Sequence, residues 1–112
     1  QIIKNATGHS LAEYMEEKLW KRIGAEQDAY WTLSNGTELA MGGLSVSLRD
    51  YARFARLYLN GGSFRGEQIL TKEWVRDSMD VSAAYSRPGA NQDVYNAIGY
   101  GYQWWVPEGD RG

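Results

Sequence analysis

The chain has 112 residues, of which 43% are hydrophobic and 23% charged, so it suits one globular core and is too apolar for a disordered chain. Its 12 basic residues are scattered among 14 acidic ones, and this balance, without a basic stripe, excludes nucleic acid as the main partner. No apolar run approaches the roughly 20 residues of a membrane-spanning helix, so no membrane contact is expected either.

Cysteine is absent, whereas aromatic residues are abundant. Without cysteine there is no disulfide framework and no thiolate chemistry, so either a cytoplasmic or a periplasmic location stays open. Five Trp and eight Tyr supply much apolar area, and their N–H and O–H groups need partners when buried. This composition favours part of a large enzyme core, or a ligand-lining surface, over a small helical module.

The first predicted element is a helix over residues 10–23. Ser10 and Glu13 are spaced as a capping box, which satisfies two backbone N–H groups at a helix start. Gly24 stands where a left-handed C-terminal cap is expected. Apolar residues recur between them at helical spacing: Leu11, Tyr14, Met15, Leu19 and Ile23.

A β-hairpin is predicted next, between residues 30–33 and 38–41. The dipeptide Asn35-Gly36 favours a tight turn between two such strands. Gly42 and Gly43 follow, where the backbone can take a positive φ or approach another segment closely.

A second helix is predicted to begin at Ser47, with Asp50 three residues on, and to end at Asn60. Residues at helical spacing form its predicted apolar stripe: Leu48, Tyr51, Ala52, Ala55, Tyr58 and Leu59. A third, shorter helix is predicted to begin at Thr71.

The remainder is predicted as a loop over residues 80–97, either a lid or surface decoration, and a strand over 98–106. Gly99 and Gly101 leave one side of this strand low, so that another segment can pack closely there. The strand has no convincing partner, although both edges of a strand cannot stay unpaired. Its sheet either includes residues 30–41 or lies outside this chain, and we favour the second.

Five stretches together form a pattern whose order along the chain is informative: residues 7–14, 20–25, 40–54, 59–70 and 99–106. Within 40–54, Gly-Gly-Leu is followed by Ser-x-x-Asp at a helix start. This series resembles the penicillin-recognising serine hydrolases, the class C β-lactamase-like esterases and amidases. Within them the likeness is to the branch of 6-aminohexanoate-dimer hydrolases and family VIII esterases.

The resemblance implies an α+β fold of the β-lactamase/transpeptidase type, in which helices and a helical subdomain cover an antiparallel sheet. Residues 1–112 align as one partial domain between the family's Tyr-x-Asn motif and its last Lys-Thr-Gly-type motif. The chain is therefore expected to be an incomplete portion, with helices of the subdomain and one strand of the sheet.

The family's chemistry is expected to lie outside this chain. In the family a Ser on Ser-x-x-Lys attacks an acyl carbon, which gives an acyl-enzyme. No Ser or Thr here has a Lys three residues on, and neither Lys-Thr-Gly nor His-x-Gly occurs. Tyr58-Leu59-Asn60 matches Tyr-x-Asn, but Tyr58 belongs to a helical stripe. We expect no catalytic residue, cofactor or metal here, and an inactive chain on its own.

The resemblance indicates Met41, Gly42 and Gly43 as a substrate-binding segment, with a buried Met under a tight turn as the alternative. Trp31 and Trp105 are further candidates, against plain core packing. The expected substrate is a small ester or amide. The expected partners are the missing segments of the same protein, or a second copy of the chain.

Two other functions stay open. A non-catalytic ligand-binding or scaffold domain with an aromatic groove predicts a cooperative monomer that binds without covalent chemistry. A complete small hydrolase would use Ser45, in a stretch that begins like a nucleophile elbow, together with His9, the only histidine. That function predicts turnover that Ser45→Ala abolishes.

Overall fold

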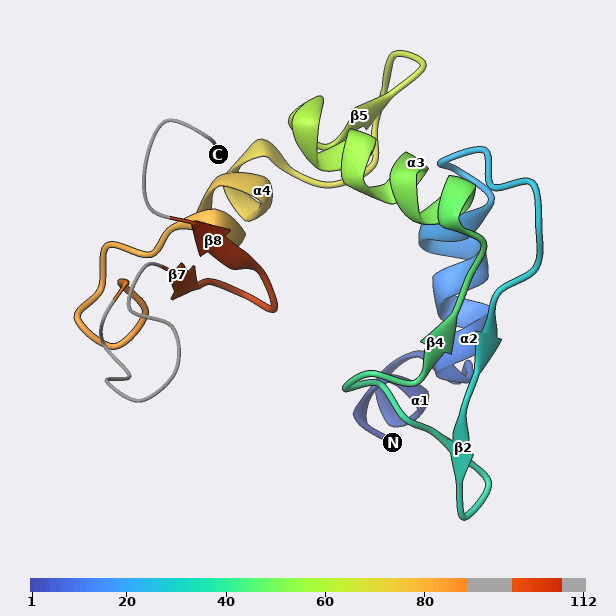
Figure 1. Cartoon of the computed structure of the whole chain (residues 1–112). Coiled ribbons are helices and arrows are strands. Elements are labelled where there is room, and N and C mark those ends of the chain that lie inside the picture. The colour runs from blue at the N-terminus through green and yellow to red at the C-terminus, as the bar shows by residue number, and fades with distance from the viewer. Residues whose placement is uncertain (89–97, 108–112) are drawn as a thin grey trace. The chain divides into compact units, whose positions relative to one another are not determined.

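The computed structural model describes residues 1–88 and 98–107, which belong to two compact units, residues 1–69 and 70–112. Each unit mixes helices with short antiparallel strands, as Figure 1 shows, so the predicted α+β class is confirmed. None of the described helices is long and apolar enough to cross a membrane. The predicted loop over residues 80–97 lies partly outside the described residues.

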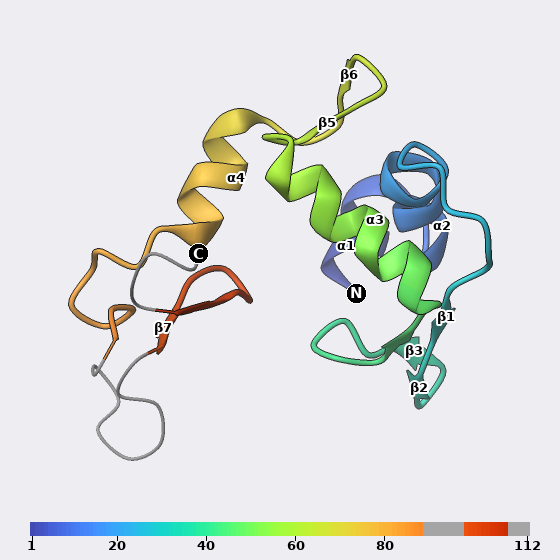
Figure 2. The ribbon, with the colours of Figure 1, turned by 45° about the horizontal axis from the view of Figure 1, so that its top comes forward.

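Unit 1 contains ten elements in chain order: α1 (Ile2–Thr7), α2 (Leu11–Met15), the π-helix η1 (Glu16–Trp20), β1 (Tyr30–Trp31), β2 (Leu33–Ser34), β3 (Thr37–Glu38), β4 (Leu44–Ser45), α3 (Leu48–Leu59), β5 (Ser63–Phe64) and β6 (Glu67–Gln68). Hairpins β2–β3 and β5–β6 lie toward opposite ends of this unit in both Figure 1 and Figure 2. Its buried apolar core is small and consists of Trp20, Ile23 and Leu57.

The predicted helix over residues 10–23 is confirmed at its start, whereas its helical residues end at Trp20 and residues 21–24 form a turn. Ser10 caps α2 by accepting a hydrogen bond from the Glu13 N–H, and the Glu13 carboxylate accepts one from the Ser10 N–H at 2.8 Å. Gly24 has a φ of 69°, the left-handed conformation expected of a helix end. Between these ends the helix widens into the π-helix η1, which the apolar spacing does not reveal.

The predicted hairpin is confirmed around its turn but not along its full length. Strands β2 and β3 pair across Asn35 and Gly36, whose φ values of 50° and 74° suit a tight hairpin turn. Strand β1 instead pairs with β4, because the Thr32 N–H donates to the Gly43 carbonyl at 2.6 Å. The prediction of a strand over 38–41 is therefore wrong beyond Glu38, where the chain turns back toward β1.

Helix α3 begins and ends as predicted, but it buries a different face. Asp50 and Leu57 are buried, whereas Leu48 and Leu59 of the predicted stripe are 84% and 86% exposed. The segment that follows η1 packs against the Asp50 side through hydrogen bonds to the Asp50 carboxylate. The sequence pattern identified an apolar face, and a polar anchor determines which face this unit buries.

Unit 2 contains three described elements: α4 (Lys72–Met79), β7 (Ile98–Tyr100) and β8 (Trp105–Pro107). Thr71 caps α4 as predicted by accepting a hydrogen bond from the Trp74 N–H at 3.1 Å. The prediction of one strand over 98–106 is wrong, because Gln103 takes a φ of 67° and the chain folds into an antiparallel hairpin. The less favoured alternative, a pairing with residues 30–41, is also wrong, since β7 pairs with β8. A sheet outside this chain stays a prediction.

The predicted close packing at Gly99 and Gly101 is confirmed. A Cβ on Gly101 would overlap the carbonyl oxygen of Ser78, and one on Gly99 would lie 2.8 Å from the Ser86 carbonyl oxygen. Backbone hydrogen bonds run beside both glycines, from the Tyr100 N–H to Ser86 and from the Tyr102 N–H to Ser78, each 2.8 Å long. The glycines therefore let this hairpin lie directly on the end of α4 and the turn after it.

Candidate substrate-binding site

The predicted substrate-binding segment forms the turn between β3 and β4. Met41 at its tip is 85% exposed, so the alternative of a buried Met under a tight turn is wrong. The turn is closed by the Gly43 N–H, which donates to the Leu39 carbonyl at 3.0 Å. The arrangement presents an unbranched, adaptable apolar side chain on a turn fixed by backbone hydrogen bonds.

The two glycines of this turn differ in what surrounds them. A Cβ on Gly43 would lie 2.9 Å from the Leu39 Cβ and 3.1 Å from the Thr32 Cβ, so the close approach of β1 requires glycine there. A Cβ on Gly42 would meet nothing within 4 Å. Packing therefore explains Gly43, whereas Gly42 lies at the surface beside Met41.

Trp31 lies beside this turn and is half-buried. It pairs across the ladder with Leu44, next to Gly43, so the structure brings Trp31 and the Gly pair together. Its Nε1 atom is buried and has no hydrogen-bond partner within the part of the chain described. Trp20, by contrast, donates from Nε1 to the Gln27 carbonyl at 2.8 Å. Because buried donors are usually paired, Trp31 differs from an ordinary core tryptophan.

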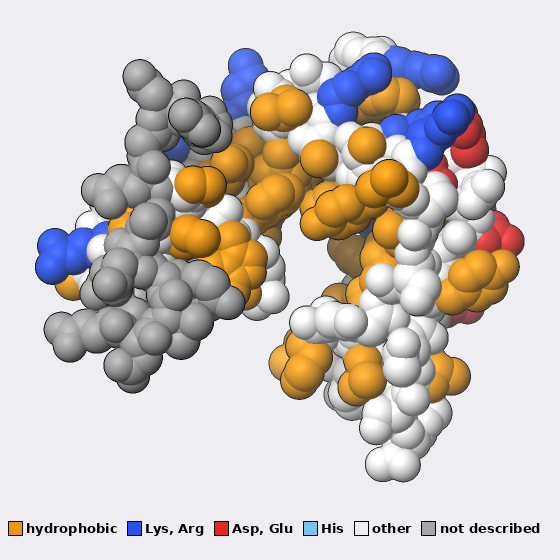
Figure 3. All heavy atoms as spheres, viewed as in Figure 1, with side chains coloured by type: hydrophobic (Ala, Val, Ile, Leu, Met, Phe, Trp, Pro, Cys, Tyr) orange, Lys and Arg blue, Asp and Glu red, His pale blue; other side chains and the backbone are white. Residues whose placement is uncertain are grey.

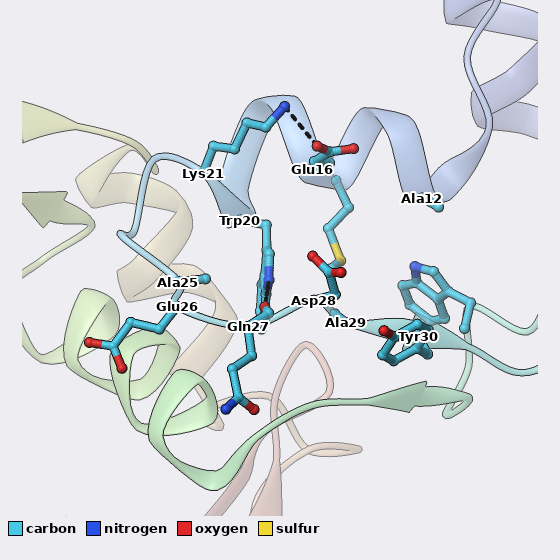
Figure 4. A pocket seen from close by; sticks show the side chains of 12 residues that line it. Ala12, Glu16, Trp20, Lys21, Ala25, Glu26, Gln27, Asp28, Ala29 and Tyr30 are labelled. Carbon is cyan, nitrogen blue, oxygen red and sulfur yellow. Dashed lines mark hydrogen bonds and ion pairs between the residues drawn. The ribbon is translucent and has the colours of Figure 1, made fainter.

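A cavity of about 400 Å³, in the size range of small-molecule pockets, is lined in part by Trp31. Figure 4 shows the Trp20 indole directed at Gln27 along one side of it, with the ion pair of Lys21 and Glu16 on the rim. Its lining is mixed: Ala12, Met15, Glu16, Trp20, Lys21, Ala25, Glu26, Gln27, Asp28, Ala29, Tyr30 and Trp31. Met41 and the Gly pair are not part of this lining.

Trp105 belongs to unit 2. It is 60% exposed on β8, and its ring tilts against that of Tyr100 with centroids 4.8 Å apart. Trp31 and the Gly pair belong to unit 1, whereas Trp105 belongs to unit 2. The role of Trp105 therefore stays a prediction.

The buried carboxylate of Asp50 anchors the segment that leads into β1, and sequence reasoning missed this role. The carboxylate accepts hydrogen bonds from the Glu26 N–H at 2.9 Å and the Gln27 N–H at 3.2 Å. It also accepts from the Ser47 hydroxyl at 2.7 Å and from Arg53 Nη1 at 2.8 Å. Ser-x-x-Asp signalled the helix cap, but no local pattern signals a contact to a segment more than 20 residues earlier.

These donors favour the charged form of the carboxyl group. The Glu26 N–H and the Ser47 hydroxyl hold the pKa of Asp50 below its ordinary value, with Arg53 and the Gln27 N–H adding to the effect and burial opposing it. Arg53 also pairs with the Glu26 side chain, so it links helix α3 to the same segment that the Asp50 carboxylate holds. Asp50 thus fixes the path of residues 26–27, from which β1 and Trp31 follow.

The residues of the alternative small hydrolase are not assembled in the described structure. Ser45 is exposed on β4 opposite Tyr30, and His9 is exposed between α1 and α2. No hydrogen bond joins Ser45 to His9 within residues 1–88 and 98–107. Tyr58 of the formal Tyr-x-Asn packs edge-on against Phe54, with ring centroids 5.3 Å apart, as a structural residue does.

Comparison with known proteins shows which proteins the chain resembles, although no protein-family model matches it. The chain is 31% identical to the 6-aminohexanoate-dimer hydrolase of Paenarthrobacter ureafaciens over 99% of its own length and 29% of that protein. It also matches a solved protein of Bacillus anthracis, named as a candidate 6-aminohexanoate-dimer hydrolase, with a TM-score of 0.83 and 37% identity. This chain is similar to one segment of a 6-aminohexanoate-dimer hydrolase.

The family resemblance seen in the sequence is thereby confirmed for that segment. The match to the Bacillus anthracis hydrolase covers 99% of this chain and 28% of that one, so the chain spans less than a third of either relative. At this TM-score its helices and short strands have the arrangement of part of a β-lactamase-like hydrolase. The fold expected from the resemblance is therefore confirmed as a portion of that fold.

Proposed function

We propose that this chain is the substrate-binding portion of a serine hydrolase that cleaves ester or amide bonds through an acyl-enzyme. The supporting observation is its similarity, over 99% of its length, to proteins named as 6-aminohexanoate-dimer hydrolases. No Ser or Thr of the chain has the Lys partner of a Ser-x-x-Lys nucleophile. In this proposal the nucleophile comes from other segments of the same hydrolase domain, and no cofactor takes part.

Met41, Gly42 and Trp31 form one wall of the proposed substrate site. The exposed Met41 side chain and the open surface at Gly42 offer apolar contact to a small substrate. Gly43 positions this turn against β1, and Trp105, an exposed aromatic residue of unit 2, stays a separate candidate for substrate contact. Such contacts hold the apolar part of an ester or amide while catalytic groups elsewhere act on its carbonyl.

A chimaeric enzyme tests this function. The segment of the Paenarthrobacter ureafaciens hydrolase that matches this chain is replaced by the chain, and hydrolysis of the 6-aminohexanoate dimer and of a chromogenic ester is measured. We expect turnover, and we expect Met41→Ala to raise KM about threefold to tenfold with little change in kcat, because contacts kept in the transition state change binding alone. Met41→Leu is the matched control. A chimaera that melts cooperatively but hydrolyses neither substrate would contradict the proposal.

A second candidate function is non-catalytic ligand binding. It is favoured by the cavity of about 400 Å³, whose lining includes Trp20, Tyr30 and Trp31. It predicts that the chain alone quenches or enhances its tryptophan fluorescence when a small aromatic amide is added, and that Trp31→Phe weakens this response. An unchanged spectrum up to millimolar ligand, together with an active chimaera, would exclude this candidate.

A further inference from the structure

Helix α3 carries two opposed faces, and only one of them is covered. Leu57 is 1% exposed and Asp50 is fully buried, whereas Leu48, Tyr51 and Leu59 are 84%, 57% and 86% exposed. At about 100° per residue, Leu57 lies on the side of the helix opposite Leu48. We define the outer face of α3 as its exposed apolar positions: Leu48, Tyr51, Ala52 and Leu59.

The outer face has the make-up of a packing surface rather than of a solvated one. Its positions follow the helical repeat and are all apolar, as expected of a stripe that packs against another element. Ala52 at its centre lets a neighbour approach closely, and Leu48 and Leu59 stand at its two ends. Figure 3 shows hydrophobic side chains gathered along α3.

The size of the outer face argues against a second copy of the chain as its occupant. A helix of 12 residues is about 18 Å long and about 10 Å wide. A patch of that footprint supplies a few hundred Å² at most, whereas a specific dimer buries about 800 Å² on each partner. Its dimensions suit one contact within a larger folded domain.

The comparison structure provides such a domain. The chain has the conformation of a segment of the Bacillus anthracis hydrolase, and the match covers 28% of that chain. Most of that hydrolase therefore lies outside the matched segment and is available to cover the helix. Resting on the proposed function, we propose that the outer face of α3 docks the nucleophile-bearing remainder of a β-lactamase-like hydrolase domain.

The charge beside the outer face adds a feature to the partner. Arg56 is exposed, and helical geometry places it close to the edge of the apolar stripe. The docking surface on the remainder is therefore expected to be apolar in its centre and polar at the edge next to Arg56. Arg56→Glu is expected to weaken docking less than substitutions within the stripe, because an edge charge stays solvated.

Assembly is tested with a binding readout that does not depend on catalysis. The chain is produced together with the Bacillus anthracis hydrolase from which the matched segment has been removed, and complexes are quantified by size-exclusion chromatography with light scattering. A 1:1 complex is expected. The double variant Leu48→Glu/Leu59→Lys is expected to lower its yield at least tenfold, although each new charge suits its end of the helix dipole. Leu33→Glu, the same kind of change on an exposed Leu of β2, is the control and is expected to lower it less than twofold.

A thiol probe keeps the proposal falsifiable if the truncated hydrolase folds poorly. The chain has no cysteine, so Ala52→Cys introduces a single exposed thiol on the outer face. In the chain alone this thiol is expected to react at the rate of an unhindered thiol, and at least tenfold more slowly in the chimaeric enzyme described above.

Equal rates in both proteins, or complex formation that the double variant leaves unchanged, would overturn the proposal. Slower reaction of the chain alone at higher concentration would also overturn it, in favour of a second copy. Protection of the thiol in a chimaera without turnover would instead refute the proposed function and leave the docking face intact.

Discussion

Asp50 shows how one residue fixes both the fold of unit 1 and the path into its candidate site. Its carboxylate meets two backbone N–H groups, a hydroxyl and a guanidinium, and it is fully buried. Removing such a group leaves the donors that face it without their acceptor, which is among the costliest of single changes. The surrounding charged side chains, Arg53, Arg49 and Glu26, remain partly exposed to water.

Asp50→Asn is expected to lower the melting temperature by about 10 °C or more at pH 7. The new side-chain NH₂ group would face backbone N–H groups that now donate hydrogen bonds to the carboxylate oxygens. Because the pKa of Asp50 is lowered in the folded chain, its stabilisation is complete above the ordinary Asp range, near pH 4, and is lost as the pH falls through the folded value. Melting curves from pH 7 to pH 3 should therefore show less acid destabilisation in Asp50→Asn than in the unaltered chain. Glu13→Gln, at an exposed carboxyl group whose pKa is also lowered, is the control. Equal melting temperatures for Asp50→Asn and the unaltered chain would contradict this assignment.

Gly42 and Gly43 are neighbours in the chain, but only Gly43 is closely packed. Gly43→Ala is expected to lower the free energy of unfolding by about 1–3 kcal/mol, because the new methyl group meets Leu39 and Thr32. Gly42→Ala has open space and no left-handed φ, so stability should stay the same or rise by up to about 1 kcal/mol. Urea unfolding measures both. A loss at Gly42 as large as that at Gly43 would show that the turn is packed differently.

Among the elements, the helix starts and the hairpin turn at Asn35-Gly36 were predictable, whereas the β1–β4 and β7–β8 pairings were not. The caps at Ser10, Ser47 and Thr71 depend on hydrogen bonds to residues three positions on, so the local sequence contains them. The sequence does not reveal the hairpin over 98–107, because its residues alternate as they would in one continuous strand. The turn between its two strands contains no Asn-Gly and no Pro that would indicate a turn. The β1–β4 pairing was missed because it depends on how the chain turns back after Leu39.

Helix α3 provides the sharpest test among the elements, since it carries two leucines of opposite exposure. Leu57→Ala is expected to lower the free energy of unfolding by about 2–5 kcal/mol, the usual effect of emptying a buried leucine site. Leu59→Ala on the outer face is expected to change it by no more than about 0.5 kcal/mol in the chain alone. Chemical unfolding of the two variants decides which face is the core. A larger loss of unfolding free energy in Leu59→Ala than in Leu57→Ala would show that the stripe predicted from periodicity is the buried face.

For the whole molecule, the resemblance to a known family predicted more of the fold than local sequence patterns did. The order of five stretches indicated the family and the partial α+β fold, and both similar proteins agree with it. The candidate site was predictable only in part: Met41 and Trp31 lie near one turn, but the exposure of Met41 and the anchoring role of Asp50 arise from contacts distant in sequence. Composition and periodicity do not encode such contacts.

The central claim is that this chain holds substrate-binding surface and no nucleophile of its own. The most direct measurement is the intact mass of the chain after exposure to a serine-reactive fluorophosphonate, beside the chimaeric hydrolase treated in the same way. We expect one unlabelled species at 12.7 kDa for the chain and one adduct per chimaera molecule. Stoichiometric labelling of the chain itself, located at Ser45 and abolished by Ser45→Ala, would show that the chain carries its own nucleophile and identify it as a complete small hydrolase.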